Sequence, residues 1–206
     1  MDLSAVRPAL GWWTVLALLL AALVLAAAAL FVMRERIPAH WHQPLRALVF
    51  GVKIDDDIRI AMPDGTHLAG TLYRPRHIDG PLPTVYVRLP YDRRRYGEAI
   101  GEGLFFARNG YAVLLQDVRG RFGSEGDDFL PWRHATSDGV ATLDWIVRQP
   151  WSNGKVGTIG CSALGELQYA LARANHPAHA AMIPIAAPGA ARDAGGDAAY
   201  FCAFEG

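Results

Sequence analysis

The chain has 206 residues, which is enough for one domain and an appended segment. Its 20 basic and 20 acidic side chains give a formal net charge of zero, so it lacks the basic excess typical of nucleic-acid-binding proteins, and no nucleic-acid partner is expected. Two cysteines, Cys161 and Cys202, are too few for a disulfide scaffold, while a hydrophobic content of 51% is slightly high for a soluble domain.

Much of the apolar excess lies in residues 9–33, which carry no charge and one polar side chain, Thr14. As a helix this segment is about 37 Å long, more than the roughly 30 Å hydrocarbon core of a bilayer. Trp12 and Trp13 at one end suit a membrane interface. The apolar region of a signal peptide is usually about 7–15 residues, which favours an uncleaved anchor. We therefore expect residues 1–36 to be a transmembrane anchor of a single-pass membrane protein, with a secreted or periplasmic protein after signal cleavage as the alternative.

The stretch after the apolar segment is less informative. Residues 37–53 contain Pro38 and Pro44 and are interpreted as a linker, either solvated or at the membrane surface. His40 and His42 lack a third ligand at a useful spacing, so no metal site is expected there. Basic residues flank the apolar segment unequally: Arg7 before it and Arg34, Arg36 and Arg46 after it. The positive-inside rule then places the following domain in the cytoplasm, whereas a signal anchor would place it outside, and the sequence leaves both open.

Residues 54–206 are interpreted as one domain in which strand and helix patterns alternate. A β-hairpin is predicted over 54–60 and 67–73, joined by a turn at Pro63-Asp64-Gly65. Further strands are predicted over 84–89, 111–116, 155–159 and 180–187, and helices over 98–109, 136–148 and 164–174. This order indicates an α/β fold with a mostly parallel sheet and helices on both faces. Ligands in such sheets bind at the carboxyl ends of the strands.

The sequence Gly160-Cys161-Ser162-Ala163-Leu164-Gly165 joins one of these strands to a helix. A serine on a glycine-flanked turn between a strand and a helix is the layout of a nucleophile elbow. The alternative is that the Ser162 side chain caps the following helix and the glycines only permit a tight turn. The regular alternation of strands and helices around the turn favours the nucleophile.

Several stretches, together with this turn, resemble the α/β-hydrolases related to cocaine esterase, glutaryl acylases and X-prolyl dipeptidyl peptidases. The similarity runs from about residue 54 to about residue 195. The stretches are 87–92 (VRLPYD), 110–120 (GYAVLLQDVRG), 123–126 (GSEG), 144–146 (DWI) and 150–157 (PWSNGKVG). Their order along the chain is more specific than the elbow by itself, and it implies an α/β-hydrolase-like domain.

The resemblance also implies roles for individual residues. Ser162 would be the nucleophile, and Tyr91 and the backbone N–H of Ala163 would donate hydrogen bonds to the oxyanion. One such donor is worth about 3–4 kcal/mol in the transition state. The substrate would be a small ester or amide, and neither a metal nor an organic cofactor is expected. Without the ordered stretches that resemble the family, Tyr91 would be interpreted as a packing residue with its hydroxyl in water.

Charged residues close to these positions have plainer interpretations. The resemblance implies that Asp117 and Arg119 tie down the loop after their strand, with roles as an acid and an electrophile as the alternative. Ser124 and Glu125 are expected to organise the same loop. The run Arg93-Arg94-Arg95 is interpreted as a solvated loop, with contact to an acidic substrate as the alternative.

The chain departs from the family pattern in two ways. Ala163 stands where the family usually has tyrosine, which removes side-chain packing and leaves the backbone N–H. The family's acid and histidine follow the serine in that order, and none of the candidates in the 44 residues after Ser162 fits. These candidates are His176, His179, Asp193 and Asp197.

Loss of the histidine lowers turnover by a factor on the order of 10⁶. We therefore expect a C-terminally incomplete hydrolase domain that is nearly inert by itself. Residues 180–187 would form an apolar edge open to self-association or to a complementing C-terminal polypeptide. The alternative is a non-catalytic, membrane-tethered remnant or binding module with the same half-fold.

Overall fold

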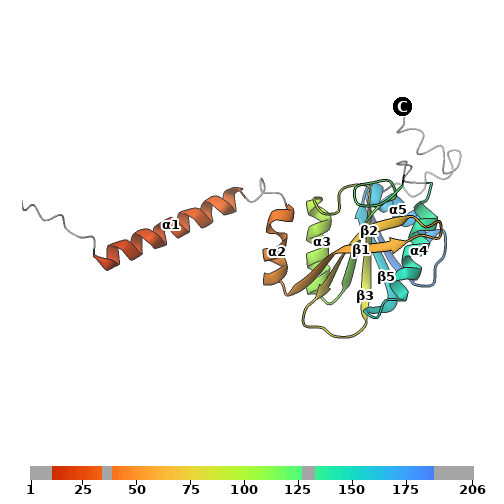
Figure 1. The fold of residues 1–206 in the computed structure, drawn as a ribbon, viewed down its shortest axis with the longest axis horizontal. Coiled ribbons are helices and arrows are strands. Elements are labelled where there is room, and N and C mark those ends of the chain that lie inside the picture. The colour runs from red at the N-terminus through yellow and green to blue at the C-terminus, as the bar shows by residue number, and fades with distance from the viewer. Residues whose placement is uncertain (1–10, 34–38, 127–132, 188–206) are drawn as a thin grey trace, which may run out of the picture. The chain divides into compact units, whose positions relative to one another are not determined.

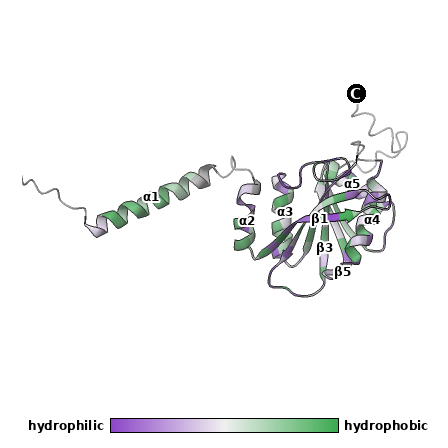
Figure 2. Ribbon diagram, viewed as in Figure 1, coloured by the Kyte–Doolittle hydropathy of each residue, from purple (hydrophilic) through white to green (hydrophobic). Residues whose placement is uncertain are grey.

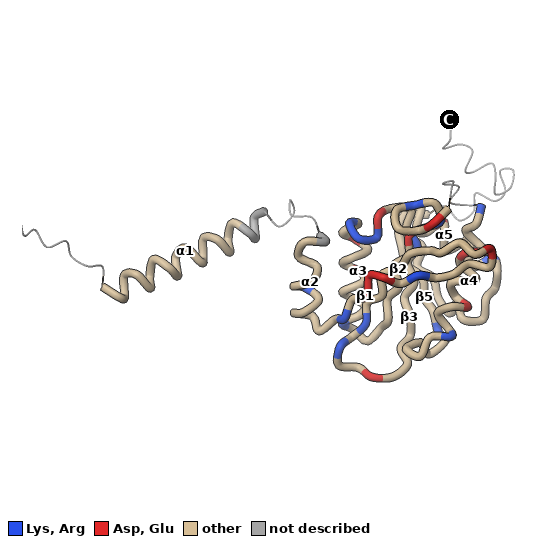
Figure 3. Tube along the Cα trace, in the orientation of Figure 1, with Lys and Arg blue, Asp and Glu red and all other residues tan. Residues whose placement is uncertain are grey.

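The computed structural model describes residues 11–33, 39–126 and 133–187. The chain forms two units, Met1–Pro38 and Ala39–Gly206, which are described separately. In the first, α1 (Trp12–Met33) is a helix without a charged residue (Figures 2 and 3). Its segment Trp12–Ala29 is long and apolar enough to cross a membrane, and none of it is buried. A signal sequence near the N-terminus has the same properties, so this helix is compatible with either function.

The second unit is a six-stranded sheet with helices on both faces (Figure 1). The strands are β1 (Val52–Ala61), β2 (His67–Pro75), β3 (Leu82–Leu89), β4 (Ala112–Asp117), β5 (Ser152–Cys161) and β6 (His179–Ile185). The helices are α2 (Ala39–Val49), α3 (Gly97–Arg108), α4 (Ala135–Val147) and α5 (Ala163–Ala172). The strand order is β1-β2-β4-β3-β5-β6. The pairs β1–β2 and β2–β4 are antiparallel and the other three pairs are parallel, which confirms the predicted α/β fold and its mostly parallel sheet.

Alternating side chains of the central strands build a core on each face of the sheet. On β4, Val113 and Leu115 join the cluster that contains Leu104 of α3. Leu114, between them, joins the cluster that contains Leu143 and Ile146 of α4. This alternation follows from the period of two of an extended strand. All six residues of β4 are buried, and its apolar run at 112–115 suits a strand that is covered on both faces.

The structure places a helix inside the predicted linker. Residues 39–49 form α2, which packs against α3 and β1 and includes Pro44. Its buried side chains are Gln43 and Ala47. The Gln43 amide donates a hydrogen bond of 2.5 Å to the Tyr73 hydroxyl on β2. This tertiary contact holds α2 on the domain, although Pro38 and Pro44 suggested an irregular segment.

The predicted apolar edge is confirmed at β6. This strand pairs only with β5 among the strands of the described residues. Its exposed large apolar side chains are Met182, Ile183 and Ile185. An apolar edge strand of this kind favours association with another strand.

Candidate active site

The predicted site residues lie where the parallel strands end, along the side of the sheet formed by their carboxyl ends, which we call the carboxyl edge. β3 and β5 are parallel neighbours that end at Leu89 and Cys161. Tyr91 follows the first of these strands by two residues, and Ser162 follows the second directly. The end of β4, Asp117, pairs with Leu89 at the same edge. The edge therefore carries Tyr91, Asp117 and Ser162 on three consecutive strand ends.

Ser162 has an unusual backbone conformation. Its φ is 55° and its ψ is −121°, which few residues other than glycine adopt. Its N–H donates to the Ile185 carbonyl at 2.9 Å, and its own carbonyl accepts the N–H groups of Gly165 and Glu166 at 2.8 and 3.0 Å. The side chain is exposed and makes no capping hydrogen bond, so it does not cap α5. The backbone is strained while the hydroxyl remains accessible, as a nucleophile elbow requires.

The two glycines of this turn are needed because other groups approach their Cα atoms closely. A Cβ at Gly160 would lie 2.3 Å from the Leu164 Cβ, and one at Gly165 would lie 2.4 Å from the Ala187 Cβ. Both distances are far shorter than carbon–carbon contacts allow. The turn therefore joins β5 to α5 in a space that admits no side chain at either position.

Ala163 is the first residue of α5. The first four N–H groups of a helix have no acceptor within the helix, and they attract negative charge together with the helix dipole. The backbone N–H of Ala163 directly follows Ser162, so it is a donor that an oxyanion at this edge would meet.

Tyr91 lies in the loop after β3 and stacks against Tyr96, with ring centroids 5.0 Å apart. Its side chain is exposed, and its hydroxyl forms no hydrogen bond with any residue among those that the structure describes. The Tyr96 hydroxyl donates to Glu98 at 2.7 Å. This bond, burial and the nearby charges of Glu98, Tyr91 and Cys161 together raise the pKa of Tyr96.

A buried ion pair fixes the loop that carries Tyr91. The guanidinium of Arg93 contacts the Asp117 carboxylate, and both side chains are excluded from solvent. Asp117 also accepts the backbone N–H groups of Arg93 and Gly123, at 3.0 and 3.1 Å. Burial raises the pKa of Asp117, while the bonds and charge supplied by Arg93 act in the opposite direction. The prediction of a solvated arginine run is therefore wrong for Arg93, although Arg94 and Arg95 are exposed.

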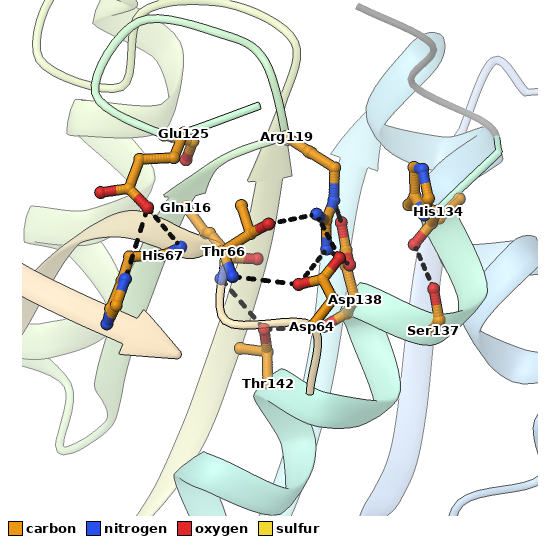
Figure 4. A network of polar contacts seen from close by, with 12 residues as sticks. Asp64, Thr66, His67, Gln116, Arg119, Glu125, His134, Ser137, Asp138 and Thr142 are labelled. Carbon is orange, nitrogen blue, oxygen red and sulfur yellow. Dashed lines mark hydrogen bonds and ion pairs between the residues drawn. The ribbon is translucent and has the colours of Figure 1, made fainter. Parts of the chain in front are cut away.

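Arg119 organises a second network, drawn in Figure 4. It binds both carboxylate oxygens of Asp138 on α4, at 2.7 and 3.0 Å. It also donates to Asp64 and to Thr66 in the hairpin turn, each at 2.7 Å. The backbone N–H of Thr66, followed by Arg119, lowers the pKa of Asp64 to about 2. Arg119 thus joins the turn between β1 and β2 to α4.

The remaining residues of this loop also make structural contacts. The Ser124 hydroxyl donates to the Asp117 carbonyl at 2.6 Å and accepts the Ala69 N–H at 2.9 Å. Glu125 accepts the His67 N–H at 2.8 Å, a contact that is visible in Figure 4. These contacts confirm the structural roles predicted for Asp117, Arg119, Ser124 and Glu125.

The two described histidines that follow Ser162 lie at the other end of the strands. His179 opens β6 and pairs with Val156, which precedes Ser162 by six residues. At about 3.3 Å per residue, the separation along the strand is ~20 Å. His176 pairs with Asp144 at 3.2 Å, and His179 binds Thr158 at 2.9 Å.

Both histidine side chains therefore have structural partners, and neither reaches the elbow. Burial, with a smaller effect from the charge of His176, lowers the pKa of His179. Asp193 and Asp197, the two acidic candidates of the sequence, fall outside the described residues.

Comparison with known proteins gives one family. The sequence model of one protein family, the X-Pro dipeptidyl-peptidase (S15 family), matches residues 64–198. Cocaine esterase of Rhodococcus sp. (strain MB1 Bresler) is 42% identical over 119 residues, which are 56% of this chain and 20% of the esterase.

Two solved structures support the same relation. A CocE/NonD family hydrolase from Staphylococcus aureus is 30% identical, with a TM-score of 0.56 over 63% of this chain and 26% of the hydrolase. An alpha-amino acid ester hydrolase is 30% identical, with a TM-score of 0.57 over 66% of this chain and 26% of that enzyme. The chain thus spans about a fifth to a quarter of the length of these relatives.

Proposed function

The chain belongs to the X-Pro dipeptidyl-peptidase (S15) family of α/β-hydrolases, and from this membership we propose that it carries the nucleophile and the oxyanion hole of a serine hydrolase for small esters or amides. The observation that carries the proposal is the elbow. Ser162 holds a strained backbone at the carboxyl end of a central strand, and its hydroxyl is exposed and does not cap the helix. A structural serine at a helix start has no need of this strain.

In the proposed reaction the Ser162 hydroxyl oxygen attacks the carbonyl carbon of the substrate and gives its proton to a base. The carbonyl electron pair moves to oxygen, where the Ala163 N–H and the Tyr91 hydroxyl donate hydrogen bonds to the negative charge. Collapse of this intermediate expels the alcohol or amine, which takes up the proton, and leaves an acyl-enzyme on Ser162. Water then attacks the acyl carbon by the same route and releases the acid.

We assign the base and its orienting acid to a complementing polypeptide, because all seven histidines of the sequence lie among the described residues. His176 and His179 support this assignment because both are engaged at the opposite end of the strands. The same observation favours a second candidate function, a non-catalytic module that keeps the half-fold and has no base.

A fluorophosphonate probe separates these functions, because it reacts with an activated serine. The full chain is labelled with and without a co-expressed C-terminal part of a longer family member. The matched variants are Ser162→Ala, which removes the nucleophile, and Ser137→Ala, which removes an exposed hydroxyl on α4. The proposal expects labelling that is lost only in Ser162→Ala, either in the chain alone or in its complemented form. If neither form is labelled, the binding module is the correct function.

We also propose that residues 1–36 anchor the protein through the apolar segment 9–33. The hydrolase domain then begins with α2 and not at residue 54, because α2 packs against α3 and β1. The support for the anchor is a helix of 22 residues without charge, of which the segment Trp12–Ala29 is not buried. Extraction of membranes with alkaline carbonate tests the anchor, and retention of the full chain in the pellet is expected. Release into the supernatant would contradict it and favour a removed signal sequence.

A further inference from the structure

Helix α2 packs on the domain with its less hydrophobic side. Helices on a protein surface normally turn their apolar stripe toward the core. In α2 the buried residues are Gln43 and Ala47. Gln43 is held there by its hydrogen bond to Tyr73, and Ala47 belongs to the core cluster of α3. The large apolar side chains of the helix are left for the other side.

These side chains form a continuous exposed stripe. Leu45 and Leu48 are each 65% exposed, Val49 is 73% exposed and Trp41 is 74% exposed. Their positions i, i+4, i+7 and i+8 lie on one face of a helix. A stripe of this kind on a surface helix marks an interaction site. We call these four residues the α2 face.

Basic and aromatic side chains border the α2 face. Arg46 is the one charged residue of α2, and its guanidinium lies 5.8 Å from the centroid of the Phe50 ring. Arg108 of α3 lies 5.2 Å from the Phe50 ring and 5.6 Å from that of Phe105, whose side chain is also exposed. Apolar side chains and a tryptophan flanked by arginines are typical of helices that lie in a membrane interface and meet anionic headgroups.

The short connection between α1 and α2 limits the distance between the α2 face and the end of α1. Residues 34–38 join Met33 of α1 to Ala39 of α2. These six steps cover at most ~20 Å when fully extended. If α1 spans a bilayer, α2 begins within that distance of the end of the span, close to the headgroups.

We propose that the α2 face lies on the phospholipid surface next to the α1 anchor, with Leu45, Leu48 and Val49 inserted among the upper acyl chains. The inference rests on the proposed anchor and is independent of the chemistry at Ser162. It makes α2 a second membrane contact, which holds the domain against the bilayer in addition to the tether.

Photo-crosslinking from lipid tests this contact. The full chain is reconstituted into vesicles of equal parts phosphatidylcholine and phosphatidylglycerol that contain a phospholipid with a diazirine high on its acyl chain. After irradiation, lipid adducts are mapped by mass spectrometry. We expect adducts on α1 and on peptide 41–49. The variant Leu45→Gln/Leu48→Gln/Val49→Gln should lower the α2 adducts about tenfold and leave the α1 adducts unchanged, because it removes the apolar area available for insertion.

A matched variant controls for exposed apolar residues in general. Met182→Gln/Ile183→Gln changes exposed side chains on β6, at the other edge of the sheet from β1, and should leave the α2 adducts unchanged. Unchanged thermal unfolding of both variants shows that each is folded. Adducts on α1 without adducts on α2 would overturn the proposal and keep the anchor. Absence of adducts on both helices would overturn both.

Discussion

Where the parallel strands end, the charged side chains of the loops after β3 and β4 are paired, whereas the turn after β5 leaves its hydroxyl exposed. The loops after β3 and β4 enclose Arg93, Asp117 and Arg119, and each of these side chains is satisfied by several partners. The turn after β5 holds Ser162 in a strained conformation with its hydroxyl exposed and not used as a helix cap. The charged side chains of the first two loops are paired, while the strained turn leaves the Ser162 hydroxyl accessible. Family resemblance draws attention to all three segments, and only the geometry separates their roles.

The largest expected effect comes from breaking the buried ion pair. Arg93→Met leaves the Asp117 carboxylate buried without its counterion, which should lower the free energy of unfolding by about 3–5 kcal/mol. The double variant Arg93→Met/Asp117→Asn should be more stable than Arg93→Met, because it removes the uncompensated charge. Urea unfolding of the full chain in detergent measures both. A double variant no more stable than Arg93→Met would show that the pair does not act as a unit.

The elbow glycines give the next largest effect. Gly165→Ala places a Cβ 2.4 Å from the Ala187 Cβ, and such overpacking should cost about 1–3 kcal/mol of unfolding free energy. Gly101→Ala in α3 is the control, since no atom lies within 4 Å of its Cβ and alanine favours a helix. Thermal unfolding should therefore shift down for the first variant and slightly up for the second. Equal shifts would mean that the turn accepts a side chain.

Glu102 lies on α3, away from the candidate active site, and one of its carboxylate oxygens lacks a hydrogen-bond partner among the described residues. Its Oε2 is buried without a hydrogen bond to the described residues, and burial, with a smaller effect from Glu98, raises the pKa of Glu102 to about 7. The folded state therefore holds its proton more tightly than the unfolded state, so this residue lowers stability as the pH rises from about 4.5 to about 7.

Replacement of Glu102 removes this dependence. Because the side chain is partly exposed, we discount the effect to about 1–2 kcal/mol. Glu102→Gln should be more stable than the parent at pH 8 and show a smaller difference at pH 4.5. The measurement is urea unfolding at both pH values. A parallel pH dependence in the two proteins would show that Glu102 is well solvated.

The sequence predicted the features that depend on local pattern. Residues 155–159 and 164–174 carry strand and helix periodicity, so the elbow between them was recognised from neighbouring residues. The burial of Arg93 and the position of α2 were not predicted, because each depends on a distant partner. Asp117 lies 24 positions from Arg93, and Tyr73 lies 30 positions from Gln43. A single sequence shows no sign of such pairs, and the two prolines near α2 suggested a linker.

The smallest effect tests the strain at the elbow. Ser162→Gly replaces a residue at positive φ with the one that adopts this region without a steric penalty, which should raise the free energy of unfolding by about 1 kcal/mol. Ser162→Ala removes the same hydroxyl and keeps the Cβ, so it should show no such gain. The difference between the two variants in urea unfolding isolates the backbone from the loss of the hydroxyl. A stabilisation of the same size in both would assign the gain to the hydroxyl, and the turn would then store no strain. A gain in glycine alone would mean that the chain accepts a less stable turn to hold Ser162 out from the sheet.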